Sequence, residues 1–317
     1  MPRAGSKPRI VCISANPAMD RRVHLATLTK GAVNRATHAR GFAGGKAAHV
    51  AMAARALAAE VSWIGFLGGA VGEECAAQLK ALGIRVNAIA TSAPTRVNLE
   101  ILEADGDITE ILEPGNAPTT AEQSRFRRSI QSQTKSSLIV ISGSLPAGVP
   151  LNFYASIIVG ARSKQIPVFL DTSGEALRVG IKAKPHFVKV NRTEAADLTG
   201  KPVATEREAL DAVREIIQQG AGSAAVTLGK DGVVWMESAE GPVWLAYPPQ
   251  MKCVSSVGCG DATLAGFAVA QSEGLTGEKA IRLAVACGAA NCASEISGRI
   301  NRASVQSLLA QVYVKRM

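Results

Sequence analysis

The clearest indication of fold class lies between "HFVKVN" at 186–191 and "AAVTLG" at 224–229, with the stretch Glu206–Gln219 between them. Both short runs are rich in apolar and β-branched residues, a pattern typical of strands that are buried on both faces. The stretch between them has the length and spacing of an amphipathic helix. Strand, helix and strand in succession predict a parallel α/β unit.

The same alternation extends in both directions along the 317 residues. Further strands are predicted at 9–14 ("RIVCIS"), 138–143 ("LIVISG") and 167–171 ("PVFLD"). Further helices are predicted at Lys46–Glu60, Asn152–Lys164, Asp261–Glu273 and Glu278–Ser294. We therefore expect one large, mainly parallel sheet with helices on both faces.

One region breaks this rhythm. Residues 96–115 read "RVNLEILEADGDITEILEPG", with alternating polar and apolar residues around the turn dipeptide Asp105-Gly106. The alternation predicts a hairpin with Val97, Leu99 and Ile101 on one side and Arg96, Asn98 and Glu100 on the other. Short β-like pieces at Val23–Leu28 and Asn34–Phe42 lie earlier in the chain. Together they predict a small sheet that forms a lid on the main domain.

Composition narrows the function classes. The chain is 47% hydrophobic and 19% charged, which predicts a folded protein with a large core. It contains no secretory signal and no apolar run near 18 residues, so we expect a cytoplasmic protein without a membrane partner. The net charge is +9, but the basic residues are dispersed and aromatics are only 4%. This pattern favours a small anionic ligand over nucleic acid.

The cysteines do not resemble a metal site. None of the six forms a C-x-x-C pair, and the four histidines lack the spacing of metal ligands. We therefore expect buried free thiols in a reducing compartment and no structural zinc.

The stretch "SSVGCGDATLAGF" at 255–267 suggests an anion site. A helix that begins near Asp261 has unpaired N–H groups in its first turn, and Gly258 and Gly260 allow them to approach an anion closely. The Asp261 carboxylate can then accept a proton from an attacking hydroxyl. It can equally be a helix N-cap, and the sequence leaves both readings open.

Other nucleotide-binding motifs are absent. In "RGFAGGKAA", Arg40 occupies the position of the first P-loop glycine, and Ala47 replaces the Ser or Thr that binds Mg²⁺. No strand is followed by G-x-G-x-x-G, so a dinucleotide site has no support.

Eight phrases occur in the order found in a known family. They are "NPAMD" (16–20), "GGKAAHVA" (44–51), "PTRVN" (94–98), "SGSLPAGV" (142–149), "DTSGEAL" (171–177), "NRTE" (191–194), "TLGKDG" (227–232) and "SVGCGD" (256–261). Together they resemble the phosphofructokinase-B family of sugar-phosphate kinases, in the ribokinase superfamily. The resemblance extends from about Ile10 to Val312.

The resemblance implies a ribokinase-like three-layer α/β/α sandwich with a small β lid. We expect one kinase domain over 1–317, with the lid at about 17–43 and 94–115. It implies an ATP-dependent kinase for a ketohexose phosphate: fructose 6-phosphate, fructose 1-phosphate or tagatose 6-phosphate. A kinase for an unphosphorylated sugar or a nucleoside and a catalytically silent sugar-phosphate regulator remain alternatives. A homodimer through the lid is implied by analogy.

The resemblance also implies roles in catalysis and cofactor binding. Asp261 is implied as the general base, with an anion hole at Gly258, Cys259 and Gly260. ATP and Mg²⁺ are the implied cofactors, with Glu194 holding the metal through water beside Asn191. Without the resemblance, Asn191 and Glu194 read as a capped first turn of a helix. Further nucleotide contacts are implied at Thr227, Gly229, Gly232 and Ser256.

The implied sugar site draws on the lid and its neighbours. Asp20 resembles the family carboxylate that binds sugar hydroxyls, and the cations implied for the substrate phosphate are Arg35, Lys46 and Arg96. Further substrate contacts are implied at Gly44, Gly45, His49, Asn98 and Ser144. His49 stands where the family commonly has asparagine, so this chain departs from the family pattern for sugar recognition. Asp171 follows a strand, where open α/β sheets bind ligands.

Overall fold

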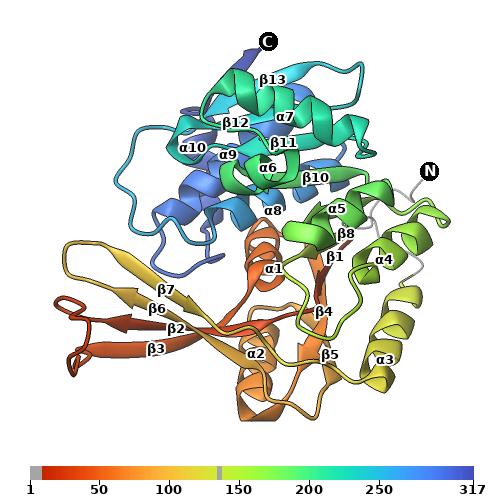
Figure 1. Cartoon of the computed structure of the whole chain (residues 1–317). Helices are drawn as coiled ribbons and strands as arrows, with labels where there is room; N and C mark the ends of the chain where they lie inside the picture. The colour runs from red at the N-terminus through yellow and green to blue at the C-terminus, as the bar shows by residue number, and fades with distance from the viewer. Residues whose placement is uncertain (1–8, 134–137) are drawn as a thin grey trace.

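The main sheet organises the molecule (Figure 1). The computed structural model describes residues 9–133 and 138–317, and in this part of the chain ten strands form one sheet. In sheet order they are β14 (Tyr313–Arg316), β13 (Val243–Tyr247), β12 (Val233–Met236), β11 (Ala224–Thr227), β10 (Phe187–Asn191), β9 (Val168–Asp171), β8 (Leu138–Ser142), β1 (Arg9–Ser14), β4 (Glu60–Leu67) and β5 (Arg85–Ala90). The run from β11 to β5 is parallel, and the other three strands add antiparallel at one edge. The predicted mainly parallel sheet is confirmed.

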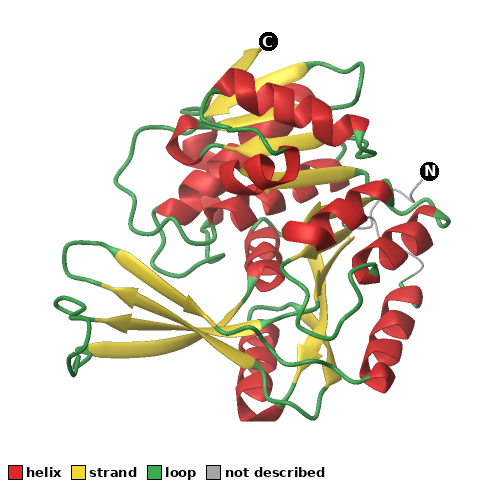
Figure 2. Cartoon of the chain, in the orientation of Figure 1, coloured by secondary structure: helices red, strands yellow, loops and turns green. Residues whose placement is uncertain are grey.

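Helices cover both faces of the sheet (Figure 2). In β1, Ile10 and Cys12 belong to one hydrophobic core, whereas Val11 and Ile13 belong to a second core on the opposite face. The first core contains side chains from α1 (Lys46–Ala56), α2 (Gly69–Ala81), α8 (Cys259–Ser272), α9 (Gly277–Cys292) and α10 (Arg302–Leu309). The second contains side chains from α3 (Thr120–Gln131), α4 (Phe153–Arg162), α5 (Gly174–Lys182), α6 (Arg192–Thr199) and α7 (Glu206–Gln218). Two cores separated by one sheet make the expected three-layer sandwich.

The predicted helices are present with small changes in their ends. The helix expected at Lys46–Glu60 ends at Ala56, because Glu60 already begins β4. The helix expected from Asp261 begins two residues earlier, at Cys259. Within the described ranges, no helix has the length and apolar character needed to cross a bilayer.

A separate four-stranded sheet extends away from the sandwich (Figure 2). Its order is β3 (His38–Gly44), β2 (Ala18–His24), β6 (Arg96–Leu102) and β7 (Ile108–Leu112). The hairpin predicted around Asp105-Gly106 is confirmed as the antiparallel pair β6 and β7, and β2 pairs with β6 in parallel. We call these four strands the lid.

The polar side of β6 faces the protein interior rather than solvent. Asn98 and Glu100 are both buried, and Glu100 Oε2 accepts a 2.6 Å ion-pair hydrogen bond from the guanidinium of Arg22 on β2. Burial of this pair is tolerated because each charge has its partner. The polar alternation in the sequence therefore marks the inner, functional side of the lid.

The carboxyl ends of the parallel strands bring polar residues to one edge of the sheet. Ser142 at the end of β8 is in register with Asp171 at the end of β9, and Asn191 at the end of β10 is in register with Thr227 at the end of β11. Open α/β sheets bind ligands at this edge. The lid extends from the same edge and completes a cavity there.

Close packing of α8 against α9 depends on Gly266. A Cβ at this position would lie 2.5 Å from Ala284 Cα and 3.0 Å from the Leu283 carbonyl oxygen, both on α9. Because these are backbone atoms, Gly266→Ala must push the helices apart. We expect it to reduce the free energy of unfolding by about 2 kcal/mol, measured by urea denaturation.

Gly160 in α4 provides the matched control. No atom lies within 4 Å of a Cβ built at this position. Gly160→Ala should therefore raise the free energy of unfolding by up to about 1 kcal/mol, through helix propensity alone. If both variants changed stability equally, the close contact assigned to Gly266 would be wrong.

Candidate active site

A cavity of about 1290 Å³ lies between the lid, the strand ends and the first turn of α8. Most of the residues predicted for the site line it. They are Asp20, Gly45, Lys46, His49, Arg96, Asn98, Ser144, Asn191, Glu194, Thr227, Gly229, Gly232, Ser256, Gly258, Cys259, Gly260 and Asp261. Two predicted residues, Arg35 and Gly44, are not part of the lining.

The glycine turn before α8 has a left-handed backbone. Gly258 is the N-cap, with φ of 79°, and a Cβ there would lie 2.9 Å from the Cβ of Ser297. Asp261 is therefore the third residue of the helix, so the N-cap reading of this aspartate is wrong. The Cys259 N–H already donates to the Ser256 carbonyl at 3.3 Å. The N–H groups of Gly260 and Asp261 have no intrahelical acceptor in this first turn.

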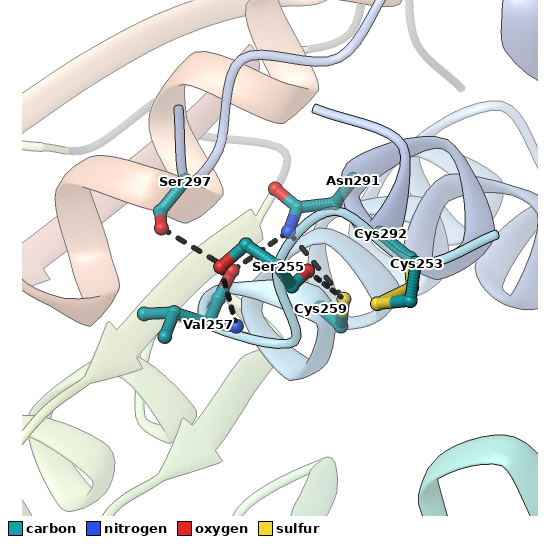
Figure 3. Close-up of a disulfide and its surroundings, with 7 residues drawn as sticks. All are labelled: Cys253, Ser255, Val257, Cys259, Asn291, Cys292 and Ser297. Atoms are coloured by element: carbon teal, nitrogen blue, oxygen red, sulfur yellow. Dashed lines mark hydrogen bonds between the residues drawn. A yellow bond between two sulfur atoms is a disulfide. The ribbon is translucent and has the colours of Figure 1, made fainter. Parts of the chain in front are cut away.

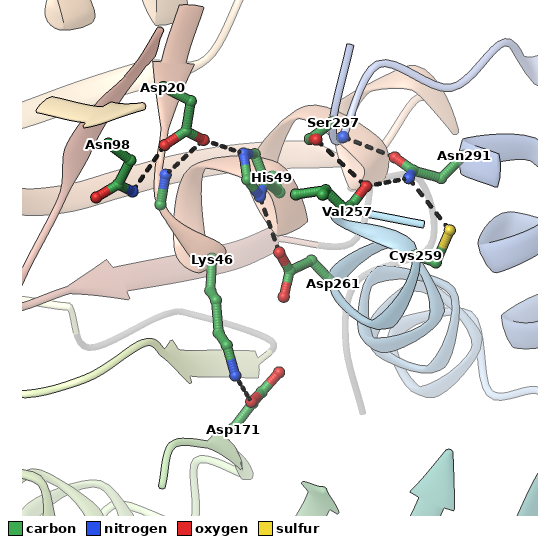
Figure 4. A network of polar contacts seen from close by, with 12 residues as sticks. Asp20, Lys46, His49, Asn98, Asp171, Val257, Cys259, Asp261, Asn291 and Ser297 are labelled. Atoms are coloured by element: carbon green, nitrogen blue, oxygen red, sulfur yellow. Dashed lines mark hydrogen bonds and ion pairs between the residues drawn. The ribbon is translucent and has the colours of Figure 1, made fainter. Parts of the chain in front are cut away.

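The Asp261 side chain is held by His49 (Figure 4). His49 Nδ1 lies 2.8 Å from Asp261 Oδ2, and His49 Nε2 lies 2.9 Å from Asp20 Oδ2. All three side chains are buried. One imidazole on α1 therefore joins a carboxylate of the lid to a carboxylate of α8.

The two carboxylates change the protonation of this histidine. Burial lowers the pKa of His49, but hydrogen bonds and charge interactions with Asp20 and Asp261 outweigh it and raise the pKa to about 10. Burial has the opposite effect on an acid and raises the pKa of Asp20. The interactions with His49, the Asn98 amide and the Gly45 N–H outweigh burial and bring this pKa below its ordinary value. A charged imidazolium between two carboxylates follows.

Gly44 and Gly45 support the Asp20 carboxylate, and Gly45 also lines the cavity. A Cβ on Gly44 would lie 2.2 Å from the Asp20 carboxyl carbon, so only glycine leaves room for this side chain. Gly45 has φ of 81° and donates its N–H to Asp20 Oδ2 at 3.3 Å. Asn98 Nδ2 donates to the other oxygen, Oδ1, at 2.8 Å. The GG dipeptide is therefore part of the support of the lid carboxylate.

A second charged cluster lies at the strand ends. The buried Asp171 carboxylate contacts Lys189 Nζ at 2.7 Å and Lys46 Nζ at 3.0 Å, and Lys46 also contacts Glu194 Oε1 at 3.0 Å. Burial lowers the pKa of Lys46, but the carboxylates of Asp171 and Glu194 raise it above its ordinary value. A Cβ on Gly260 would lie 3.1 Å from Lys189 Nζ, so this ammonium is next to the first turn of α8.

Asn191 and Glu194 form a capping box. Asn191 Oδ1 accepts from the Glu194 N–H, and Glu194 Oε2 accepts from the Asn191 N–H, both at 2.8 Å. The capped-turn reading of this pair is confirmed. Residues 9–133 and 138–317 contain no group of three or more His, Cys, Asp or Glu able to hold a metal. With Lys46 on its other oxygen, Glu194 fits a metal contact through water better than direct ligation.

Three further residues predicted to bind the substrate are Arg96, Ser144 and Arg35, and each has different surroundings in the structure. The Arg96 guanidinium donates to the carbonyls of Pro17, Glu113 and Asn16, which uses three of its five N–H groups. Ser144 Oγ accepts from Asn16 Nδ2 at 3.1 Å. Arg35 is exposed in the connection between β2 and β3. Its separation from the cavity does not support the predicted phosphate contact.

Known proteins that are similar to this chain are carbohydrate kinases, which agrees with a site suited to phosphoryl transfer. Residues 8–301 match the family described as pfkB family carbohydrate kinase. The chain belongs to this family. A relative named 1-phosphofructokinase from Bacillus subtilis (strain 168) is 31% identical over 310 residues, which cover 97% of this chain and 100% of the relative.

Solved structures give the same result for this pfkB-family kinase. Phosphofructokinase-2 from Escherichia coli in complex with fructose-6-phosphate matches with a TM-score of 0.88 and 26% identity, over 96% of this chain and 99% of that chain. The tetrameric inhibited form of the same enzyme matches with a TM-score of 0.89 and 26% identity, with the same coverage. The ribokinase-like fold and the carbohydrate kinase family are therefore established for this chain.

A disulfide corrects the expectation that all six cysteines are free thiols (Figure 3). Cys253 and Cys292 are bonded and line the cavity, while Cys12, Cys75 and Cys287 are buried free thiols as predicted. No local sequence pattern indicates this pair, because the two cysteines are separated by 39 positions. The fold brings them together: the N–H groups of Val254 and Ser255 both donate to the Cys292 carbonyl.

Sequence reasoning missed several residues of this kinase site. Lys189 lies inside the apolar strand run "HFVKVN", and a charged residue within a strand predicted to be buried was the available signal. The structure shows that it is buried beside Asp171. Asn16 and Glu100 also line the cavity. Asn16 belongs to the "NPAMD" motif and Glu100 to the polar side of the predicted hairpin, and neither pattern alone predicts a role for them. Arg22 does not line the cavity but pairs with Glu100, which does, and this pair could not be predicted because the two residues are 78 positions apart.

Removing the disulfide should reduce stability. For Cys253→Ser and Cys292→Ser alike, closure of a loop of this length predicts a loss of about 4 kcal/mol in the free energy of unfolding under oxidising conditions. In dithiothreitol the wild type should lose this advantage and match both variants. Thiol titration of the denatured, unreduced protein should find four of the six cysteines free. A count of six would contradict the bond.

Proposed function

We propose that this protein transfers the γ-phosphoryl group of ATP to a hydroxyl of a ketohexose phosphate. The observation that carries the proposal is the convergence of Asp261, in the first turn of α8, with Asp20 and Asn98 of the lid in one cavity. The name of the Bacillus relative and the ligand of the Escherichia structure both support a fructose phosphate. We propose fructose 1-phosphate or fructose 6-phosphate, with tagatose 6-phosphate as a further candidate.

The lid offers acceptors for sugar hydroxyls. Asn98 Oδ1 is buried, has no hydrogen-bond partner among the described residues, and belongs to a side chain that lines the cavity. Buried polar atoms without partners are uncommon in folded proteins, and a ligand hydroxyl would satisfy this one. Asp20 Oδ1 accepts one bond, from Asn98, and retains a lone pair for another. These oxygens support a polyhydroxylated substrate.

Proton acceptance is assigned to Asp261. Its Oδ2 is bonded to His49, while Oδ1 accepts no hydrogen bond from the described residues and is available to the reacting hydroxyl. The hydroxyl oxygen attacks the γ-phosphorus, its proton passes to Asp261, and the bond from phosphorus to the bridging oxygen breaks to release ADP. The N–H groups of Gly260 and Asp261 would stabilise the negative charge of the transferred phosphoryl group, and the ammonium of Lys189, which is close by, would add to this stabilisation.

The nucleotide is proposed to lie on the opposite side of Asp261 from the lid. Thr227, Gly229, Gly232 and Ser256 line this part of the cavity. Gly229 and Gly232 have φ of 66° and 100°, so the backbone after β11 turns sharply beside the proposed nucleotide. Mg²⁺, when bound, would neutralise charge on the ATP phosphates, with Glu194 contacting it through water.

The phosphate carried by the sugar needs a cation in the cavity. Arg96 retains two of its five N–H groups after its three carbonyl contacts, and it lies at the base of the lid. Lys46 is already paired with Asp171 and Glu194, which places it nearer to the transferred phosphoryl group. We therefore assign the substrate phosphate to Arg96.

We further propose a cytoplasmic enzyme in which 1–317 is one kinase domain, with the lid at about 17–43 and 94–115. Its substrates, ATP and a sugar phosphate, support that location. A disulfide such as Cys253–Cys292 is unusual in a reducing compartment. Thiol titration of protein isolated without reductant therefore also tests the proposed cytoplasmic location.

The lid also supports a homodimer. Ile111 and Leu112 on β7 are exposed, at 54% and 59%, and Val33 in the connection between β2 and β3 is exposed at 81%. Exposed apolar groups on a sheet with open edges favour association with a second copy. Sedimentation velocity should show a dimer or larger oligomer, and Ile111→Lys should shift it toward monomer. A wild-type monomer at micromolar concentration would contradict the proposal.

A coupled assay for ADP release tests the substrate class. Turnover should be highest on one of three sugar phosphates: fructose 1-phosphate, fructose 6-phosphate or tagatose 6-phosphate. Free fructose and adenosine should give kcat/KM values at least about a hundredfold lower, because the substrate phosphate contributes binding energy. Higher turnover on fructose or adenosine would favour the alternative kinases, and no turnover on any substrate would favour the silent regulator.

Asp261→Asn tests the mechanism in the same assay. An amide cannot accept the hydroxyl proton, so kcat should fall by about a hundred- to ten-thousandfold while sugar-phosphate binding is largely kept. Asp211→Asn, on the exposed surface of α7, is the matched control and should leave kcat unchanged. Near-normal kcat in Asp261→Asn would show that another group is the base.

A further inference from the structure

The hydrogen bonds of His49 impose a condition on charge. An ionised carboxylate only accepts hydrogen bonds, and a neutral imidazole has one N–H and one lone pair. Both ring nitrogens of His49 lie within 2.9 Å of a carboxylate oxygen. With a neutral ring, one carboxylate would face a lone pair at hydrogen-bond distance. Two short contacts of this kind fit an imidazolium that donates to both acids.

We propose that His49 is a positioning residue that acts as a permanent imidazolium bridge, holding the sugar-binding Asp20 and the general base Asp261 in one fixed arrangement. This inference rests on the proposed kinase function. Direct binding of sugar by His49, as expected from the sequence, is not supported, because neither ring nitrogen is free. The bridge sets the spacing between the hydroxyl held by Asp20 and the hydroxyl activated by Asp261.

The surroundings of His49 fix its ring and its charge. A Cβ on Gly298 would lie 2.6 Å from His49 Cα, so the loop at Gly298 packs directly on this turn of α1. The titratable groups that act on the ring are Asp20 from β2 and Asp261 from α8. Glu110 on β7 interacts with it at longer range, and Lys46 precedes it by three residues on α1. The net field of these groups favours the charged ring.

The bridge has two halves that can be removed separately. The amide nitrogen of asparagine lies as far along the side chain as histidine Nδ1, and that of glutamine as far as Nε2. His49→Asn therefore keeps the donor to Asp261 and releases Asp20. His49→Gln keeps the donor to Asp20 and releases Asp261. The pair forms a matched set, because each variant retains the contact that the other loses.

The two variants should divide the kinetic effects. For His49→Asn we expect KM for the sugar phosphate to rise by about ten- to a hundredfold with kcat largely retained, the range for loss of one charge-assisted hydrogen bond. For His49→Gln we expect kcat to fall by a similar factor with KM largely retained. Equal changes in kcat and KM in both variants would show that His49 has only a general structural role, and would overturn the proposed bridge.

The charge of the ring is tested in the wild-type protein without any assay of activity. In protein labelled with ¹⁵N-histidine, one of the four histidines should keep the imidazolium signature at pH 8 and lose it only as the pH approaches about 10. The signal missing from the spectra of His49→Asn and His49→Gln assigns it. Titration of this signal near pH 6.5 would overturn the proposal even if the kinase assay succeeded. A persistent imidazolium in a protein without kinase activity would leave the bridge standing and contradict the proposed function instead.

The raised pKa also predicts how stability depends on pH. The folded protein holds the His49 proton more tightly than the unfolded chain does, so this contribution is complete below about pH 6.5. It declines as the pH rises and is lost once the pH passes about 10. Wild type and His49→Gln should therefore converge in thermal stability between these values, and a constant difference would contradict the ionised bridge.

Discussion

The site depends on one imidazole that contacts two acids from different parts of the fold. His49 on α1 reaches Asp20 on the lid and Asp261 on α8. Helix α1 also packs directly against α8 and follows strand β3 of the lid in sequence, so His49 lies where the three elements meet. The contacts hold the Asp20 side of the lid, where we propose that the sugar binds, at a set distance from the first turn of α8. Both acids need support of their own, which explains the glycine at position 44 and the left-handed turn at Gly258. In this account, the lid and the phosphoryl-transfer site are two parts of one charged unit.

Electrostatics divides the cavity into two regions. Around Asp20, the lid presents oxygen acceptors, including the unpartnered amide oxygen of Asn98, and these suit hydroxyl groups. Around Gly260, the first turn of α8 and the ammonium groups of Lys46 and Lys189 suit phosphate oxygens. The reacting hydroxyl and the γ-phosphate must meet at the boundary between these regions. Asp261 lies at this boundary, which is where a general base for phosphoryl transfer is needed.

The sequence predicted local features well and distant contacts poorly. Strand runs such as "AAVTLG", the hairpin turn at Asp105-Gly106 and the glycine turn before α8 depend on neighbouring residues, and all three appear in the structure. The Asp171–Lys189 pair and the Cys253–Cys292 bond join residues from separate elements, and no local pattern reports such contacts. Arg35 is a different case: the resemblance implies a place near the sugar phosphate, whereas the residue lies on the exposed connection between β2 and β3, outside the cavity lining. The role of His49 required coordinates, because both of its partners are far away in sequence.

The arrangement around His49 can be tested in a crystal structure of the protein with a ketohexose phosphate and a non-hydrolysable ATP analogue. We expect the terminal phosphate analogue to accept hydrogen bonds from the N–H groups of Gly260 and Asp261. We also expect one sugar hydroxyl on Asp261 Oδ1 and another on Asp20, with His49 still between the two acids. A nucleotide bound away from the first turn of α8, or a sugar that displaces His49 from both carboxylates, would contradict this arrangement.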